Sequence, residues 1–130
     1  MLFMSTFPQE YVEACRARVR SDADAFAKSG APTELEPVFF RNLLLALEAS
    51  FVHRGRGIEG KDGNPLNEVR VLCNSVLLHD GVMTAEKSIR LDPARSVLGI
   101  AYGEQVALDG ASFARLSDAF FTELEGKFLE

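Results

Sequence analysis

The chain has 130 residues, enough for one domain, and its 47% hydrophobic and 25% charged residues indicate a globular protein and exclude a disordered one. The net charge of −5 argues against a dedicated binder of nucleic acid or of an anionic membrane, because basic residues supply most of the affinity of such proteins. The start of the chain lacks the basic segment of a signal peptide, and no apolar run approaches the roughly 20 residues of a membrane helix, so we expect a soluble, cytoplasmic protein.

Apolar residues recur at helical spacing in four segments. This pattern predicts a mainly α-helical fold with a four-helix core, formed as a single domain over residues 1–130. The first helix is expected to begin at Pro8, which suits a first turn, and to end at Gly30. The second opens within residues 33–37, either with a capping box of Thr33 and Glu36 or with Glu36 as the cap and Pro37 in the first turn.

The third and fourth predicted helices have recognisable ends. Asn64 is expected to cap the third helix, with Pro65 in its first turn, and the Asp-Gly pair at 80–81 to end it. The last helix is expected to start within residues 109–112 and to carry its apolar face as far as Phe128.

Between these two helices the pattern changes to short apolar runs. The runs span residues 88–91, 97–101 and 105–108, contain β-branched residues, and are separated by Pro93 and Gly103. The Gly-Glu pair at 103–104 suggests a hairpin turn. We therefore predict a small antiparallel β element of two or three strands between helices three and four.

Two of the predicted helices are apolar on more than one side. The second helix has an additional stripe of Val38, Leu45 and Val52, and the third has a smaller one of Val71 and Leu78. The core face of the third helix comprises Leu66, Val69, Leu72, Cys73, Val76 and Leu77. Two helices of this kind leave apolar surface for a partner, so we predict a homodimer built from helix faces.

Residue types that bind metals or act as nucleophiles are present but do not form a known pattern. His53 and His79 stand 26 residues apart, and no spacing is typical of a zinc, calcium, di-iron or hydrolase site. Cys15 and Cys73 fall on apolar helix faces and are interpreted as small core residues, not as a disulfide or a reactive thiol. We predict no metal and no cofactor, and we assign no catalytic residue.

The most informative stretch is the glycine-rich segment at residues 53–64, which leads into the third predicted helix. It matches the bare G-x-G-x-x-G pattern and the first seven residues of a Walker A motif. Neither match follows the strand that such nucleotide sites require, and Asp62 stands where a Walker A motif needs Ser or Thr. The composition favours a flexible connection between two helices.

The alternative interpretation of this segment is a local anion site. Glycines allow close approach of backbone N–H groups, and a helix N-terminus adds free N–H groups and a partial positive charge. The residues predicted to form the site are Arg54, Arg56, Lys61, Asn64, Asn67 and Arg70. Glu59 and Asp62 would weaken it, and Arg70 has a competing role, since it could pair with Glu48 or Glu59 and fix the loop. Because buried polar groups need partners, such a structural network is favoured.

Two hypotheses about function follow from the sequence. The first is a small, non-catalytic helical protein that acts through self-association or by binding a partner or a small ligand. The second is an anion- or nucleotide-handling enzyme with its site in the glycine-rich region at residues 53–67. The missing catalytic motifs favour the first hypothesis.

Overall fold

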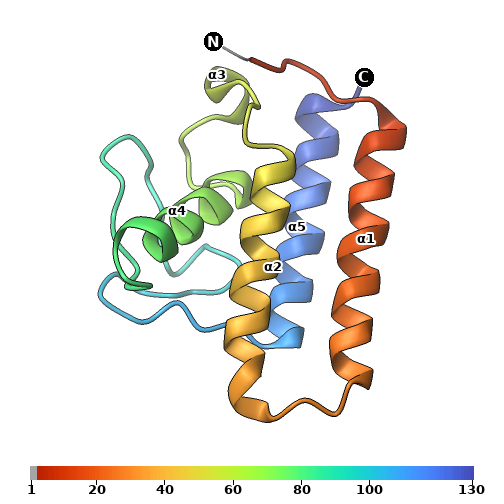
Figure 1. Ribbon diagram of the computed structural model, residues 1–130. Helices are drawn as coiled ribbons and strands as arrows, with labels where there is room; N and C mark the ends of the chain where they lie inside the picture. The colour runs from red at the N-terminus through yellow and green to blue at the C-terminus, as the bar shows by residue number, and fades with distance from the viewer. Residues whose placement is uncertain (1–2) are drawn as a thin grey trace.

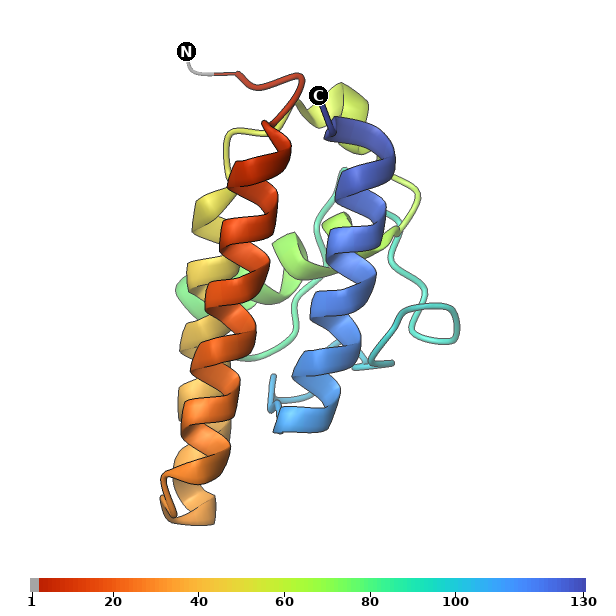
Figure 2. The ribbon, with the colours of Figure 1, turned by 90° about the vertical axis from the view of Figure 1, so that its right-hand side faces the viewer.

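The computed structural model describes residues 3–130, and over this range the chain is mainly α-helical, as predicted (Figure 1). Helices α1 (Gln9–Lys28), α2 (Glu36–Ser50) and α5 (Gly110–Phe128) stand side by side. Helix α4 (Pro65–Leu78) crosses α2 and α5 on the side away from α1 (Figures 1 and 2). These four helices correspond to the predicted core. The structure adds a 3₁₀ helix, η1 (Thr33–Leu35), and a short helix, α3 (Arg56–Glu59), within the glycine-rich segment.

The expected cap of α4 is present, and α5 begins within the expected range with a cap of its own. The side chain of Asn64 accepts hydrogen bonds from the first turn of α4, and Asp109 and Ser112 form a reciprocal capping box at the start of α5. The capping box expected from Thr33 and Glu36 is not formed, because Thr33 belongs to η1 and makes no capping hydrogen bond. The carboxylate of Glu36 instead accepts a hydrogen bond from the backbone N–H of Gly110, at 3.0 Å.

The core between α1, α2 and α5 is built largely from aromatic rings. The fully or nearly fully buried rings are Phe7, Phe40, Phe51, Phe113, Phe120, Phe121 and Phe128. Several pack edge to face, a favourable arrangement for aromatic pairs; the ring centroids of Phe120 and Phe121, for example, are 5.7 Å apart. Cys15 and Cys73 are free and buried in this core, as predicted, and burial raises the pKa of both thiols.

The first and last segments of the described chain are joined through Phe7. Its backbone N–H donates to the carbonyl oxygen of Phe128 at 2.7 Å, and its own carbonyl accepts from the N–H of Glu130 at 3.1 Å. The ring of Phe7 packs edge to face on Phe51, with ring centroids 5.1 Å apart. Backbone and side chain thus fix the same residue between α2 and α5.

The predicted antiparallel β element is wrong. Residues 3–130 contain no sheet, and the backbone at 88–91, 97–101 and 105–108 is irregular. Val82 and Gln105 form an isolated antiparallel bridge in this part of the chain. A turn does occur at the expected Gly-Glu pair, where Gly103 has a φ of +92° that favours glycine.

The backbone of this irregular segment is held in two ways. Residues 81–83 form three backbone hydrogen bonds with residues 103–106 around the isolated bridge, and other backbone groups bond to side chains of α4. The carboxylate of Glu68 accepts hydrogen bonds from the N–H groups of Val97, at 2.8 Å, and Leu98, at 3.0 Å. The hydroxyl of Ser75 accepts one from the N–H of Thr84, at 3.0 Å. These side chains of α4 accept hydrogen bonds from individual backbone N–H groups of the segment. The short apolar runs are therefore held in place without forming the continuous hydrogen bonds of a β-sheet.

The second apolar faces are only partly as expected. Val38 on α2 and Val52, in the turn just after α2, are exposed, but Val71 on α4 is buried in the core. Leu77, assigned to the core face from the sequence, is 65% exposed, and its neighbour Leu78 is 71% exposed. The free apolar surface of α4 is therefore at its C-terminal end. Within residues 3–130, no helix combines the length and apolar character needed to cross a membrane.

Candidate functional site

Arg54, one of the residues predicted to bind an anion, is buried inside the protein. Its Nη1 donates to Glu48 Oε1 at 2.9 Å and to the carbonyl oxygen of Phe51 at 3.1 Å, and its Nη2 donates to the carbonyl oxygen of Leu66 at 3.1 Å. The guanidinium carbon also lies 5.4 Å from the ring centroid of Phe120, within the range of a cation–π contact. With these partners Arg54 joins α2 to α4 and has no open side for a ligand.

Glu59, at the end of α3, occupies the centre of the same cluster and is fully buried. Its carboxylate accepts hydrogen bonds from Arg70 Nη2 at 2.5 Å, Arg70 Nε at 3.2 Å and Asn67 Nδ2 at 2.7 Å. Arg54 Nε lies 3.0 Å from Glu59 Oε1, but its N–H is not directed at this oxygen, so the contact is an ion pair and not a hydrogen bond. Burial alone would raise the pKa of Glu59; the bonds from Arg70 and the charge of Arg54 outweigh it and hold that pKa below its ordinary value.

Glu48 completes the cluster. It pairs with Arg54, and Arg70 Nη1 lies 3.9 Å from its Oε2. Burial raises the pKa of Glu48 despite both guanidinium groups. We call Glu48, Arg54, Glu59, Asn67 and Arg70 the ionic corner, because together they hold α2, α3 and α4. The interpretation that Arg70 pairs with Glu48 or Glu59 and fixes the loop is confirmed.

The N-terminus of α4 was predicted to donate N–H groups to an anion, and the protein already uses those groups. Asn64 Oδ1 accepts from the N–H of Leu66 at 2.9 Å and of Asn67 at 3.2 Å, and the carbonyl oxygen of Asn64 accepts from Glu68 at 3.0 Å. Pro65 has no N–H to offer. The side chain of Asn67 points back to the loop, where its Oδ1 accepts from the N–H of Gly63 at 2.9 Å. Asn64 and Asn67 thus have structural partners in place of a ligand.

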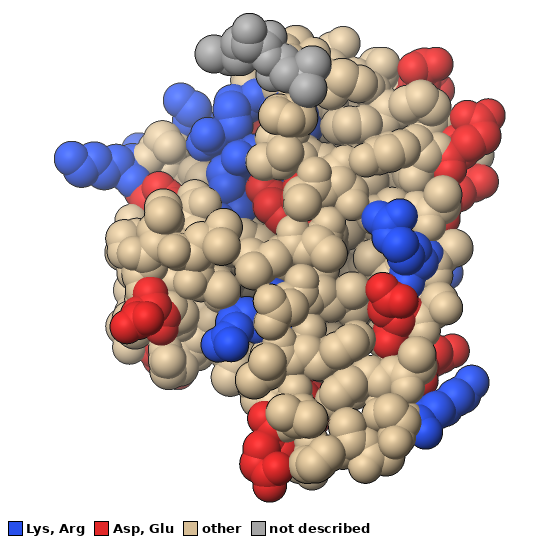
Figure 3. Space-filling model, in the orientation of Figure 1, with Lys and Arg blue, Asp and Glu red and all other residues tan. Residues whose placement is uncertain are grey.

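Three exposed basic residues remain around this loop. Arg56 lies on α3, Lys61 follows it, and Arg90 comes from the irregular segment, where its backbone N–H donates to the carbonyl oxygen of Lys61 at 3.1 Å. Their side chains form no ion pair or hydrogen bond with any residue that the structure describes. Lys and Arg side chains gather over α3 and the loop that follows it, at the upper left of the space-filling view (Figure 3). We call Arg56, Lys61 and Arg90 the basic face.

A glycine allows Arg90 to reach this place. Gly63 has a φ of +88°, and a Cβ atom at this position would overlap the carbonyl oxygen of Arg90. Of the acids in the loop, Glu59 is buried and paired in the ionic corner, whereas Asp62 is exposed and keeps its negative charge, since a hydrogen bond from Asn64 Nδ2 at 2.8 Å lowers its pKa; the three cations outnumber this one exposed carboxylate. The basic face therefore carries a local excess of positive charge on a protein with a net charge of −5.

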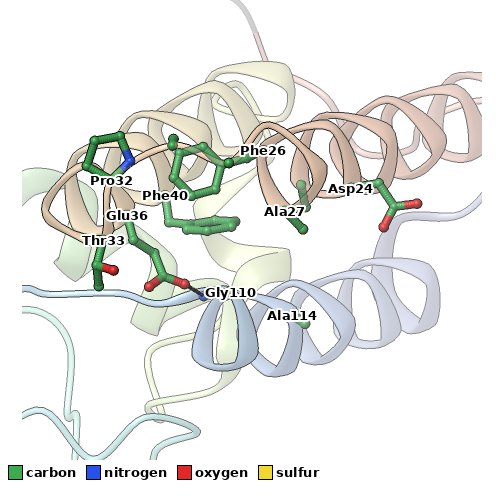
Figure 4. Close-up of a pocket in the computed structure, with 12 residues that line it drawn as sticks. Asp24, Phe26, Ala27, Pro32, Thr33, Glu36, Phe40, Gly110 and Ala114 are labelled. Carbon is green, nitrogen blue, oxygen red and sulfur yellow. Dashed lines mark hydrogen bonds between the residues drawn. The ribbon is translucent and has the colours of Figure 1, made fainter.

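A separate cleft lies at the opposite end of the helices, between the end of α1, η1 and the start of α5 (Figure 4). Its volume of about 440 Å³ falls within the range of small-molecule and cofactor pockets. Phe26 and Phe40 form its apolar floor, and the carboxylate of Glu36 reaches across toward Gly110 (Figure 4). The cleft is not part of the site predicted from the sequence.

The groups that commonly carry catalysis are poorly placed for it. His53 and His79 are exposed near the ends of α2 and α4, and the two thiols are buried with raised pKa values. Over residues 3–130, no group of three or more His, Cys, Asp or Glu side chains could hold a metal ion. The buried carboxylates with shifted pKa values are also engaged: Glu48 and Glu59 lie inside the ionic corner, and Glu68 accepts hydrogen bonds from the backbone of Val97 and Leu98.

Comparisons with known proteins assign no family: the chain matches no protein-family model, no curated protein and no solved structure. The residues and their surroundings are therefore the basis for inferring a function.

The structure separates the residues of the predicted site into exposed and internal ones, and it brings a further exposed cation to the loop that sequence reasoning missed. Arg56 and Lys61 are exposed as expected, whereas Arg54, Asn67 and Arg70 were predicted to bind a ligand and form internal contacts. Arg90 was not considered, because it is 29 residues from Lys61 in the chain. In the sequence, Arg90 is only a basic residue in a segment rich in turn residues. Nothing nearby in the sequence shows that this segment packs against the loop that contains Lys61.

Proposed function

We propose that this is a non-catalytic binding protein whose basic face of Arg56, Lys61 and Arg90 contacts an anionic group on a ligand or partner. The supporting observation is that Lys61 and Arg90, which are distant in the chain, are joined by a backbone hydrogen bond. The exposed Arg56 lies on the helix just before Lys61. Opposite charge attracts most strongly where no internal carboxylate competes for the cations, and these three side chains have no described acidic partner.

The ionic corner supports this proposal by providing a rigid base. Glu59 lies at the end of α3 and is held by Arg70 and Asn67, so the helix that carries Arg56 is fixed to α4. Lys127 on α5 adds a further bond, from its Nζ to the carbonyl oxygen of Glu59 at 2.9 Å. A fixed backbone lowers the entropic cost of presenting flexible basic side chains to a ligand.

The chemistry of the face favours a multiply charged anion such as a phosphate chain. Arg and Lys both bind phosphate, Arg through paired N–H groups and Lys as a point charge. The first N–H groups of α4 already have partners, so binding would depend on side chains and weaken steeply with added salt.

Inorganic triphosphate is a suitable probe. We expect Arg56→Ala, Lys61→Ala and Arg90→Ala together to weaken its binding by about tenfold or more, as the loss of three surface charge contacts of roughly 0.5 kcal/mol each implies. The matched control replaces Arg20, Lys28 and Arg115, which are exposed on α1 and α5, so both triple variants lose three positive charges. Titration calorimetry at low and high salt measures the affinity. Equal binding by the two triple variants would remove the proposal.

Self-association is a second candidate function, because the end of α4 exposes an apolar patch. Leu77 and Leu78 are exposed side by side, and Val82 is exposed just beyond them. Burying such a patch in a symmetric contact would produce the predicted homodimer. Light scattering should then give twice the chain mass of 14.3 kDa, and Leu77→Ser with Leu78→Ser should return the monomer. A monomer at micromolar concentration in the parent protein would contradict this candidate.

A further inference from the structure

The cleft in Figure 4 is the wide end of a longer furrow between α1 and α5. It shares Ala23 and Ala114 with an adjoining hollow of about 160 Å³ whose floor includes Val19 and Phe113. Arg20 and Asp118, 3.7 Å apart, close the far side of that hollow. From Gly110 to Asp118 the furrow follows nine residues of α5, or roughly 13 Å at 1.5 Å per residue.

Small residues keep the furrow open. Beside Asp24 and Phe26, helix α1 contributes Ala23 and Ala27, and α5 contributes Gly110 and Ala114, whose short or absent side chains leave the space between the helices unfilled. Helices α1 and α2 also extend past the point where α5 begins (Figure 2). As a result, the ring of Phe26 is only partly buried, although it stacks on Phe39 with ring centroids 4.5 Å apart.

The charges of the furrow are unbalanced at its wide end. The residues that line this end include the carboxylates of Asp24 and Glu36 but no Lys or Arg. Farther along, the acids have basic partners across the furrow, since Arg20 pairs with Asp118 and Arg16 with Glu125. Glu36 is fixed in place by the N–H of Gly110, which bonds to its Oε2, while Oε1 receives no hydrogen bond from a described residue. A positive group at the wide end would therefore complement the furrow.

The geometry points to a docking site for an apolar segment of a partner protein, about two helical turns long, with a Lys or Arg that reaches Glu36 and Asp24. The length of the furrow favours a segment over a small amine, which would occupy the wide end alone and leave the adjoining hollow beside the exposed Ala114 empty. The partner's apolar side chains would cover Phe26 and the alanines, and its cation would supply the missing charge.

The test is a library of 12-residue peptides displayed on phage and selected against the whole chain. We expect enrichment of peptides that combine apolar residues with Lys or Arg. A synthetic copy of the enriched peptide should lose most of its binding to Ala114→Phe, which fills the furrow from an exposed position. The control, Ala17→Phe, is exposed on α1 outside the furrow and should bind normally. Glu36→Gln keeps an acceptor for Gly110 and should weaken binding by roughly fivefold, as expected for one surface ion pair.

Four outcomes of the binding experiments would overturn the proposal. The selection could enrich no sequence, or it could enrich acidic peptides. The synthetic peptide could bind Ala114→Phe as well as it binds the parent protein. Finally, hexylammonium could displace the peptide at equal affinity, which would indicate a small-amine site. Light scattering of the parent protein and of Ala114→Phe provides one more check. A dimer that Ala114→Phe dissociates would assign the furrow to a second copy of this chain and also overturn the proposal.

Discussion

Two parts of the molecule are each held by a buried glutamate, and the partners of the two carboxylates differ. In the ionic corner, Glu59 lies between the guanidinium groups of Arg54 and Arg70. In the irregular segment at residues 79–109, the partners are the backbone N–H groups that bond to Glu68. Burial favours the neutral form of both carboxyl groups. The two arginines reverse this effect and lower the pKa of Glu59, whereas the two amides do not, and the pKa of Glu68 is raised by burial.

This comparison shows that a buried carboxylate can hold neighbouring segments through charged arginine partners or through uncharged backbone N–H groups, with different consequences when the carboxylate is removed. The ionic corner connects three helices, and removing any one charge would leave another buried without compensation. The contact of Glu68 holds an otherwise irregular segment against α4 and can be lost without stranding a positive charge. The corner should therefore be the more sensitive of the two regions.

The largest expected effect is that of Glu59→Ala. This change removes the carboxylate that Arg70 bonds and leaves Arg70 and the buried Arg54 with Glu48 as their only acid in the corner, so we expect a loss of about 3–5 kcal/mol in the free energy of unfolding. Urea denaturation measures it. In the control, Glu123→Ala breaks the partly exposed pair with Lys127 and should cost at most about 1 kcal/mol. Equal losses in the two variants would show that the charges of the ionic corner depend on one another no more than those of a partly exposed pair do.

Glu68→Ala should have a smaller, more local effect. It removes two acceptors from backbone N–H groups and should cost about 1–3 kcal/mol. Hydrogen exchange at the amides of Val97 and Leu98 should accelerate, while amides in the middle of α2 keep their protection relative to global unfolding. If exchange at these two amides is unchanged, the segment is held by its apolar contacts and not by the carboxylate.

The smallest expected effect is a difference in pH dependence between Glu59→Gln and Glu68→Gln. The folded pKa of Glu59 is below its ordinary value of 4.5, so its stabilisation is present above that pH and disappears as the pH falls through the folded pKa. The folded pKa of Glu68 is above 4.5, so the folded state gains relative stability as the pH falls from above that pKa toward 4.5.

The free-energy cost of the two substitutions should consequently change in opposite directions. From about pH 8 down to about pH 4, the cost of Glu59→Gln should stay level and then shrink, whereas the cost of Glu68→Gln should grow. Urea denaturation across this range measures both curves. Parallel curves would mean that the two carboxylates experience the same environment in the folded protein.

The helices could be predicted from the sequence because their signals are local. Asn64 and Asp109 cap the residues that directly follow them, and the apolar faces repeat within each helix. The irregular segment could not be predicted, because the groups that satisfy its backbone, Glu68 and Ser75, lie on α4 and resemble ordinary polar helix residues. Short apolar runs with β-branched residues then look the same as strands.

The candidate site divides in the same way. Exposure of Arg56 and Lys61 follows from their place in a polar, glycine-rich loop. The burial of Arg54 in that loop depends on Glu48 and Glu59, which approach it from two different helices, so its neighbours in sequence give no sign of it. The sequence also gives no local sign of the cleft, because the cleft forms where α1 extends past the first turn of α5 (Figure 2).

The position of Phe7 has a consequence for the order in which the protein folds. Its backbone partners, Phe128 and Glu130, are more than 120 residues away in the chain, yet its ring belongs to the central aromatic core. Closing so long a loop costs entropy that only later contacts recover. On the ribosome, α1, α2 and α4 emerge before α5, so we expect these three helices to associate early and the segment around Phe7 to join the end of α5 as a final step.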